Sequence, residues 1–248
     1  MSDPTFSVIL NHAPWAKDRV QTCETMQREL DSMLHDVELM VHDTDYRAGG
    51  PSAKDKPVDF TLAQWRWAAK VGVTHHVFMT DDLDLAPGFL EILSAMCIAA
   101  PGRILGLLSN HPLVPELLKS GHRWYRTNSW VVGPCYVVPH AHLVPLLAWA
   151  ESRGPGGSVD RLGWSDDSEL NEWITYEGPR EAYHPIPTPI EHKKALSTWG
   201  HTGHGDDYSH ERVSWRSDGE PFPYLTAKRM RAPAYWRGAE TAPMLGLP

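Results

Sequence analysis

The alternation of apolar, strand-like runs with amphipathic helical segments constrains the fold of this chain more than any other feature. Residues 6–12, FSVILNH, form a buried-type run, and residues 17–34 then place apolar side chains at helical spacing. The pattern continues with strands expected at 37–45, 75–80 and 103–110 and with helices expected at 61–72 and 87–100. This alternation predicts an α/β fold whose mixed, mostly parallel sheet is covered by helices on both faces.

The second half of the chain has a looser pattern. Residues 124–151 indicate a strand, a turn, a strand and a helix, a Gly-rich loop follows, and a helix is expected at 165–174. No clear period is present after about residue 205. We therefore expect one main domain over residues 1–205 and an irregular C-terminal extension over residues 206–248 that packs on it.

Composition narrows the classes of partner. The formal net charge of −8 would repel a polyanion unless a local basic face reversed it, which disfavours nucleic acid against a small ligand. The three cysteines include no CxxC pair, and no stretch approaches the roughly 18 apolar residues that a membrane span needs. The sequence thus predicts a soluble, cytoplasmic protein with no membrane partner.

Three carboxylates, Asp81, Asp82 and Asp84, follow directly after the apolar run HHVFMT. Carboxylates at the end of a buried strand suit Mg²⁺ or Mn²⁺, which take oxygen ligands and would offset the repulsion between the aspartates. The other interpretation is a solvated acidic turn before a helix, whose N-terminus favours negative charge. Both interpretations stay open on these residues alone.

The stretch TDDLDLAPGF resembles the EDDLxxxPxF motif of nucleotide-sugar-dependent glycosyltransferases with the A-type fold, and among them the N-acetylglucosaminyltransferases acting on mannosyl glycoproteins. WYRTNSWVVGPCYVVP is similar to the family's YRxxxxxxGxGWxL segment, GWSDDSEL to its WDDW segment, and the stretch at 184–205 to its PxxxxHxGxxS segment. The chain departs from the pattern at Thr80, at Ser168, and at Lys193 and Lys194.

The resemblance implies a metal-dependent, inverting transferase that moves a sugar to an acceptor hydroxyl. It makes Asp82 the ligand of a Mn²⁺ or Mg²⁺ ion, with Asp84 beside it and His192 as a further ligand. Asp167 would be the catalytic base, with Asp166 as the fallback. The bland alternative for both is that they only favour a helix N-terminus.

The resemblance also implies where a nucleotide-sugar donor, expected to be a UDP-sugar, would bind. The ends of the first two strands would hold the nucleoside, Gly133 would line the sugar, and Lys193 can bind the diphosphate. Arg19 can equally be an exposed helix residue. The donor-binding candidates are Asn11, His12, Arg19, Asp43, Asp45, Asp81, Gly133 and Lys193, and the aromatic residues suited to packing on a sugar are Trp124, Tyr125, Trp130 and Trp199.

Two other functions stay open. The acceptor, a glycan or protein in the leading hypothesis, can be a modified nucleic-acid base, because residues 210–238 interleave basic and aromatic side chains. A non-catalytic sugar- or nucleotide-binding protein with the same fold is the third hypothesis.

Overall fold

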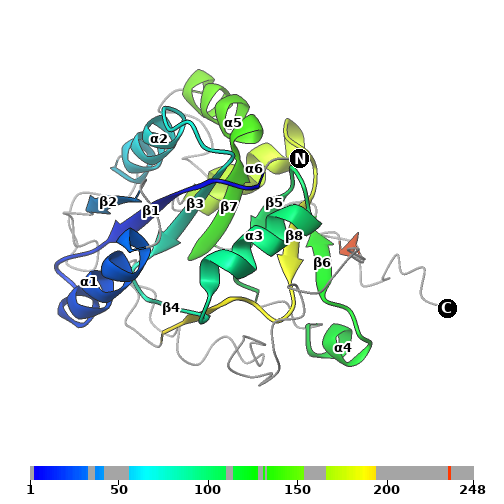
Figure 1. Ribbon diagram of the computed structural model, residues 1–248. Helices are drawn as coiled ribbons and strands as arrows, with labels where there is room; N and C mark the ends of the chain where they lie inside the picture. Colours follow the sequence, from blue (N-terminus) through cyan, green and yellow to red (C-terminus); the bar gives the residue numbers. More distant parts are fainter. Residues whose placement is uncertain are drawn as a thin grey trace.

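The computed structural model describes residues 3–32, 37–41, 56–109, 114–127, 131, 133–153, 166–193 and 234–235 (Figure 1). Within these ranges the elements are β1 (Phe6–His12), α1 (Lys17–Asp31), β2 (Val37–Val41), α2 (Lys56–Ala68), β3 (His75–Thr80), β4 (Leu83–Leu85), α3 (Phe89–Ala99), β5 (Ile104–Gly106), α4 (Val114–Lys119), β6 (Trp124–Thr127), β7 (Cys135–Pro139), α5 (His140–Ser152), α6 (Asp166–Tyr176), β8 (Ala182–Pro185), β9 (Ile190–His192) and β10 (Ala234–Tyr235).

The described strands form one large sheet and one small one. The large sheet has the order β10-β6-β8-β5-β7-β3-β1-β2, and β4 pairs with β9 in the small sheet. In the large sheet β1 pairs in parallel with both β2 and β3, while β7 runs antiparallel to its neighbours β3 and β5. The predicted α/β fold with a mixed, mostly parallel sheet is confirmed.

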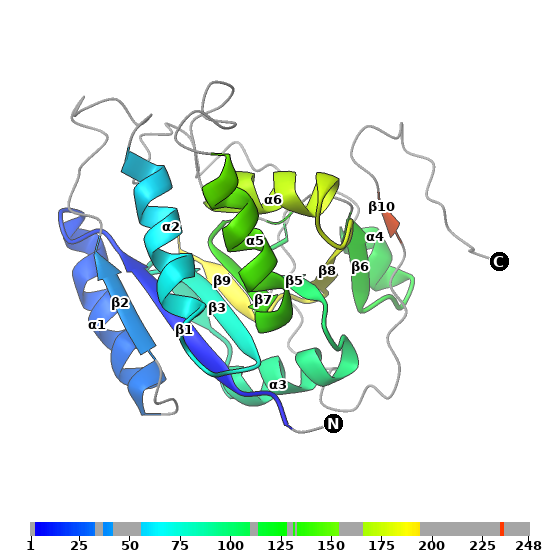
Figure 2. The same cartoon turned by 90° about the horizontal axis from the view of Figure 1, so that it is seen from above.

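Apolar side chains alternate between the two faces of the sheet, because successive residues of a strand point to opposite sides. On β1, Val8 and Leu10 belong to a core with α1 and α3, whereas Ile9 belongs to a second core with α2, α5 and α6. Figure 2 shows these two sets of helices on opposite sides of the sheet. Both faces are therefore dry, which explains why the central strands read as continuous apolar runs.

The strand order reverses at β1. The chain leaves β1 through α1 to β2 on one side and returns through α2 to β3 on the other side. Connections that leave neighbouring parallel strands in opposite directions open a crevice at the carboxyl ends of those strands, where α/β proteins bind ligands. Here that position is the end of β1, at His12, and the end of β3, at Thr80.

Most of the elements expected from the sequence are present. The strands at 6–12 and 75–80 have the expected bounds, whereas α2 begins at Lys56 instead of residue 61, and β5 is shorter than expected. Residues 42–45 of the expected second strand lie outside the described residues. Of the C-terminal extension the structure describes only β10, which adds to β6 at the sheet edge. None of the described helices is long and apolar enough to cross a membrane.

Candidate active site

Asp81 lies at the centre of the hydrogen bonds between the ends of β1 and β3. Its Oδ2 accepts from the backbone N–H of Ala13 at 3.1 Å and lies 2.6 Å from Nδ1 of His12, and its Oδ1 accepts from Arg19 at 3.0 Å. Only 1% of the Asp81 side chain is exposed. The carboxylate joins β1, the turn after it and α1 to β3, so the interpretation as a solvated acidic turn is wrong for Asp81.

Arg19 bridges two aspartates. Its Nη1 lies 3.0 Å from Oδ1 of Asp81, its Nη2 lies 2.6 Å from Oδ2 of Asp82, and 6% of its side chain is exposed. The expectation of an exposed helix residue is wrong. Arg19 precedes Cys23 by four residues and Met26 by seven, so it lies on the buried face of α1. It extends that face toward the carboxyl end of β3, where Asp81 and Asp82 lie.

Asp82 is also buried, with 4% of its side chain exposed, so the solvated-turn interpretation fails for it as well. Its Oδ1 accepts the hydroxyl of Thr80 at 2.6 Å, and its Oδ2 faces Arg19. The backbone carbonyl of Asp82 accepts the N–H of Lys193 at 2.8 Å. The Asp82 carboxylate is therefore held by Thr80 at the end of β3 and by Arg19 of α1, and its backbone carbonyl is held by Lys193 after β9.

A turn before β7 connects this edge to α6. The backbone N–H of Thr80 donates to the carbonyl of Pro134 at 3.0 Å, and the N–H of the adjacent Gly133 donates to Oδ2 of Asp167 at 3.0 Å. A Cβ at Gly133 would lie 3.1 Å from the Asp167 carboxyl group, so the carboxylate rests on the glycine backbone. Asp167 lies in the first turn of α6, which begins at Asp166; the side chain of Asp166 is outside the described part.

The pairing of β4 with β9 brings the three predicted metal ligands into one region. Leu83 is paired with His192, and Asp84 is paired with Glu191. The side chain of Asp84 is 29% exposed and its Oδ1 lies 2.8 Å from Nζ of Lys193. Asp84 thus lies in a short strand instead of the expected turn. For His192 the structure describes the backbone position in β9 and not the side chain.

Asn11 lies at the end of β1 on the side that faces α2. Its amide N–H donates to Oε1 of Gln64 at 3.2 Å, while its Oδ1 has no hydrogen-bond partner among the described residues. Asn11 is 8% exposed. A buried acceptor without a donor is costly, and a ribose hydroxyl or a base N–H is a suitable donor for it.

The remaining donor-site candidates have different outcomes. Asp43 and Asp45 lie outside the described residues, as do Trp130 and Trp199. Trp124 and Tyr125 are 2% and 0% exposed and belong to the interior, so the expectation that they stack on a sugar is wrong. Neither ring face is available to a ligand at this position of the chain.

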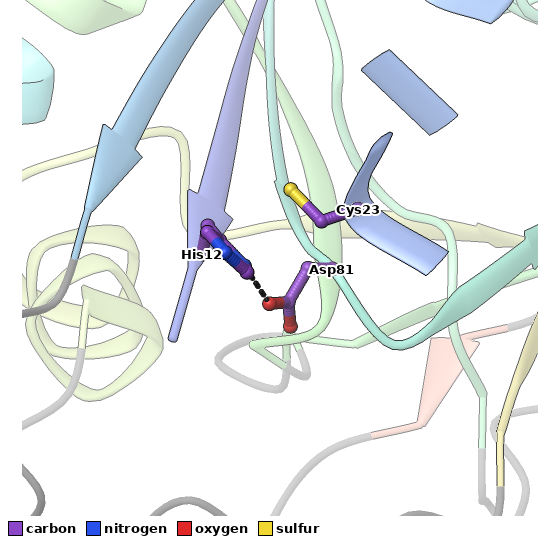
Figure 3. A group of neighbouring side chains, drawn as sticks. All are labelled: His12, Cys23 and Asp81. Atoms are coloured by element: carbon purple, nitrogen blue, oxygen red, sulfur yellow. Dashed lines mark hydrogen bonds and ion pairs between the residues drawn. The ribbon is translucent and has the colours of Figure 1, made fainter. Parts of the chain in front are cut away.

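His12, Cys23 and Asp81 form a compact group whose ligand atoms lie within 4.8 Å of one another (Figure 3). The chemistry of the group argues for a structural role, because both oxygens of Asp81 already accept hydrogen bonds from the protein. Burial, followed by the charges of Asp81 and Glu24, raises the pKa of the Cys23 thiol to about 12. Cys23 therefore packs here as a neutral thiol.

Sequence reasoning assigned no function to two residues of the site, Thr80 and Gln64. Thr80 was noted only because it replaces an acidic residue of the motif. Its hydroxyl, two residues before Asp82, can donate a hydrogen bond to the Asp82 carboxylate. Gln64 is 1% exposed and lies on the buried stripe of α2 with Thr61 and Trp65. A polar residue on an otherwise buried helix face was the signal that could have found it.

No protein-family model and no curated protein sequence matches this chain. Among solved structures, a glycosyltransferase involved in glycosylation of the major capsid of PBCV-1 matches with a TM-score of 0.39 and 11% identity, covering 71% of this chain and 77% of that one. The glycosyltransferase GlyE of Streptococcus pneumoniae TIGR4 matches with a TM-score of 0.36 and 9% identity, covering 71% and 44%.

A third structure, mannose-1-phosphate geranyltransferase from Thermus thermophilus, matches with a TM-score of 0.39 and 8% identity, covering 76% of each chain. Two of these three proteins are glycosyltransferases. All three TM-scores are below 0.5.

Proposed function

We propose that this protein is a metal-dependent glycosyltransferase that moves a sugar from a nucleotide-sugar donor, a UDP-sugar, to an acceptor hydroxyl with inversion. One observation carries the proposal: four segments that resemble transferase motifs lie together at the carboxyl ends of β1 and β3. The backbone N–H groups of Thr80 and Lys193 donate hydrogen bonds to the carbonyls of Pro134 and Asp82. The backbone N–H of Gly133 donates to the carboxylate of Asp167. These contacts join residues that are up to 111 positions apart in the sequence.

Asp82 and Asp84, with His192 on the paired strand, would hold the Mn²⁺ or Mg²⁺ ion, whose chemistry when bound is to stabilise the charge of the leaving diphosphate. The donor set fits such an ion, because carboxylate oxygens are ligands that hard cations prefer. Asn11 would accept a hydrogen bond from the nucleoside, and Lys193 would attract the diphosphate. The carboxyl ends of β1 and β3 are the place where α/β folds bind such ligands.

Asp167 is the proposed general base. The acceptor O–H proton passes to its carboxylate while the acceptor oxygen forms a bond to the anomeric carbon. The bond from that carbon to the diphosphate oxygen breaks, and the leaving nucleoside diphosphate takes the electron pair. The hydrogen bond from the backbone N–H of Gly133 would orient the Asp167 carboxylate for this transfer.

The test measures release of UDP from a panel of UDP-sugars, with Mn²⁺ and with a chelator, and transfer to candidate acceptors. Asp82→Asn should abolish Mn²⁺-dependent nucleotide binding, and Asp84→Asn should be milder. Asp167→Asn should keep donor and metal affinity while transfer falls by about 10²-fold or more, the size of a lost general base. Asp166→Asn should reduce transfer less.

Each of the other outcomes would indicate a different function. Nucleotide binding with no turnover of any UDP-sugar would indicate the non-catalytic binding protein. Activity only on an oligonucleotide that carries a hydroxylated base would indicate the nucleic-acid acceptor. No metal-dependent binding or turnover of any nucleotide sugar would reject the transferase. The proposed compartment is the cytoplasm, in line with three buried cysteines that form no disulfide.

A further inference from the structure

Arg19 occupies the position at Asp82 where the proposed function requires a divalent cation. Its Nη2 lies 2.6 Å from Oδ2 of Asp82, and the other oxygen of that carboxylate accepts the hydroxyl of Thr80 at 2.6 Å. Arg19 and Asp82 are both almost fully buried. A cation that approaches Asp82 therefore has to compete with a charge that the chain itself supplies.

The guanidinium is held at two points by two different nitrogens. Nη1 bonds to Asp81, which is fixed in addition by His12 and by the backbone of Ala13. Nη2 bonds to Asp82, whose other carboxylate oxygen accepts from Thr80. The bond to Asp81 can persist while the bond to Asp82 breaks, because each uses its own N–H group.

We infer that Arg19 is a displaceable counter-ion of Asp82, an inference that rests on the proposed metal-dependent function. Without ligands Arg19 bridges the two adjacent buried carboxylates of Asp81 and Asp82. When the metal and the donor bind, Arg19 releases Asp82, keeps Asp81 as its anchor, and donates to the diphosphate of the nucleotide. A guanidinium suits that second role because its planar N–H groups match phosphate oxygens.

The exchange predicts weak binding of the metal alone. If the state in which Asp82 is released has a population of about 0.1–10%, the apparent affinity of the metal is reduced by about 10- to 1,000-fold. A nucleoside diphosphate stabilises the released state, because only then does Arg19 face its phosphates. Metal and nucleotide should therefore bind cooperatively, and each should raise the affinity of the other by the same factor.

The experiment is calorimetric titration of the full chain with Mn²⁺ alone, with UDP alone and with Mn²⁺ at saturating UDP. It compares the natural chain with Arg19→Gln and Arg19→Lys. Arg66→Gln is the matched control, because Arg66 also pairs with a carboxylate, Glu151, but is half exposed on α2. The affinity of Mn²⁺ for UDP in buffer is measured separately and subtracted.

Arg19→Gln should bind Mn²⁺ alone at least about tenfold more tightly than the natural chain, and the cooperativity with UDP should fall by a similar factor. Arg19→Lys has one ammonium group for two carboxylates, so its affinity for Mn²⁺ should lie between those of the natural chain and Arg19→Gln. Arg66→Gln should match the natural chain. If Arg19→Gln folds only with Mn²⁺ present, its melting temperature should rise steeply with Mn²⁺, which supports the same competition.

Weaker or unchanged Mn²⁺ affinity in both Arg19 variants would overturn the inference and make Arg19 a fixed support of the site. In that case normal Mn²⁺ and UDP binding by the natural chain would leave the transferase proposal intact. If the natural chain and all the variants bind neither Mn²⁺ nor UDP, the transferase proposal itself fails. The two failures are thus separated by the titration of the natural chain.

Discussion

Replacing Asp81 with asparagine removes one carboxylate from the buried cluster without changing its size. The aspartate accepts hydrogen bonds from three segments of the chain, through His12, Ala13 and Arg19. An asparagine has one acceptor oxygen and one N–H₂ group in the same space. If the asparagine oxygen accepts the hydrogen bonds from His12 and Ala13, its N–H₂ group faces the guanidinium of Arg19. Two hydrogen-bond donors then face each other without an acceptor.

The expected loss of stability follows from these contacts. A hydrogen bond to a charged group contributes about 1.5–3 kcal/mol, and breaking a buried ion pair from one side costs about 3–5 kcal/mol. Arg19 keeps its second partner, Asp82, so its charge is not left unpaired. We therefore expect Asp81→Asn to lower the free energy of unfolding by about 3 kcal/mol.

Asp84→Asn is the matched control, because Asp84 lies three positions away and also pairs with a cation. Its side chain and that of its partner Lys193 are 29% and 35% exposed, and an exposed pair contributes at most about 1 kcal/mol. Urea denaturation with a chelator present measures both variants, at unchanged dependence on urea concentration. Losses of equal size, or a loss below about 1 kcal/mol for Asp81→Asn, would refute the buried arrangement described here.

Gly106→Ala should cost about 1–3 kcal/mol, because its Cβ would lie 2.5 Å from the buried His184 ring; Gly72→Ala, which meets nothing within 4 Å, should leave the urea midpoint nearly unchanged. Burial and neighbouring histidines lower the pKa of His76 to about 4. The unfolded chain then binds more protons, so unfolding free energy should fall by up to roughly 3 kcal/mol between pH 6.5 and 4, and His76→Gln should flatten that slope. Burial raises the pKa of the Cys97 thiol to about 12, so a thiol reagent at about pH 8 should react slowly until urea is added.

The central strands could be predicted from the sequence because their burial leaves a local signal. β1 and β3 are buried on both faces, so each contains an uninterrupted apolar run, VIL in β1 and VFM in β3, and polar residues follow each run at the end of the strand. The aspartates that follow β3 were recognised as a possible site for the same reason: charge directly after a buried run is conspicuous. The start of α2 was missed by five residues, although Pro57 and Asp59 are residues that suit a first helical turn.

The contacts that build the site carried no such signal. β4 and β9 have three residues each and lie more than 100 positions apart, so neither periodicity nor length identifies their pairing. For Arg19 the sequence left open both an exposed position on a helix and a place in the donor site. Its burial depends on the position of α1 against the sheet edge and on two carboxylates that follow β3, which are properties of the assembled fold.

The exposure of the three aspartates increases along the chain, from 1% for Asp81 through 4% for Asp82 to 29% for Asp84. Asp81 and Asp82 share Arg19 as a cationic partner, and Asp84 pairs with Lys193. A carboxylate that binds a ligand must exchange partners without unfolding its surroundings. Asp81 has hydrogen-bond partners in three segments, whereas Asp84 has a more exposed pair with Lys193. In the proposed exchange Asp82 releases Arg19, and Arg19 keeps Asp81 as its second anchor. Because Arg19 is the buried partner of Asp82, the proposed exchange would make the affinity of Asp82 for a cation depend on Arg19.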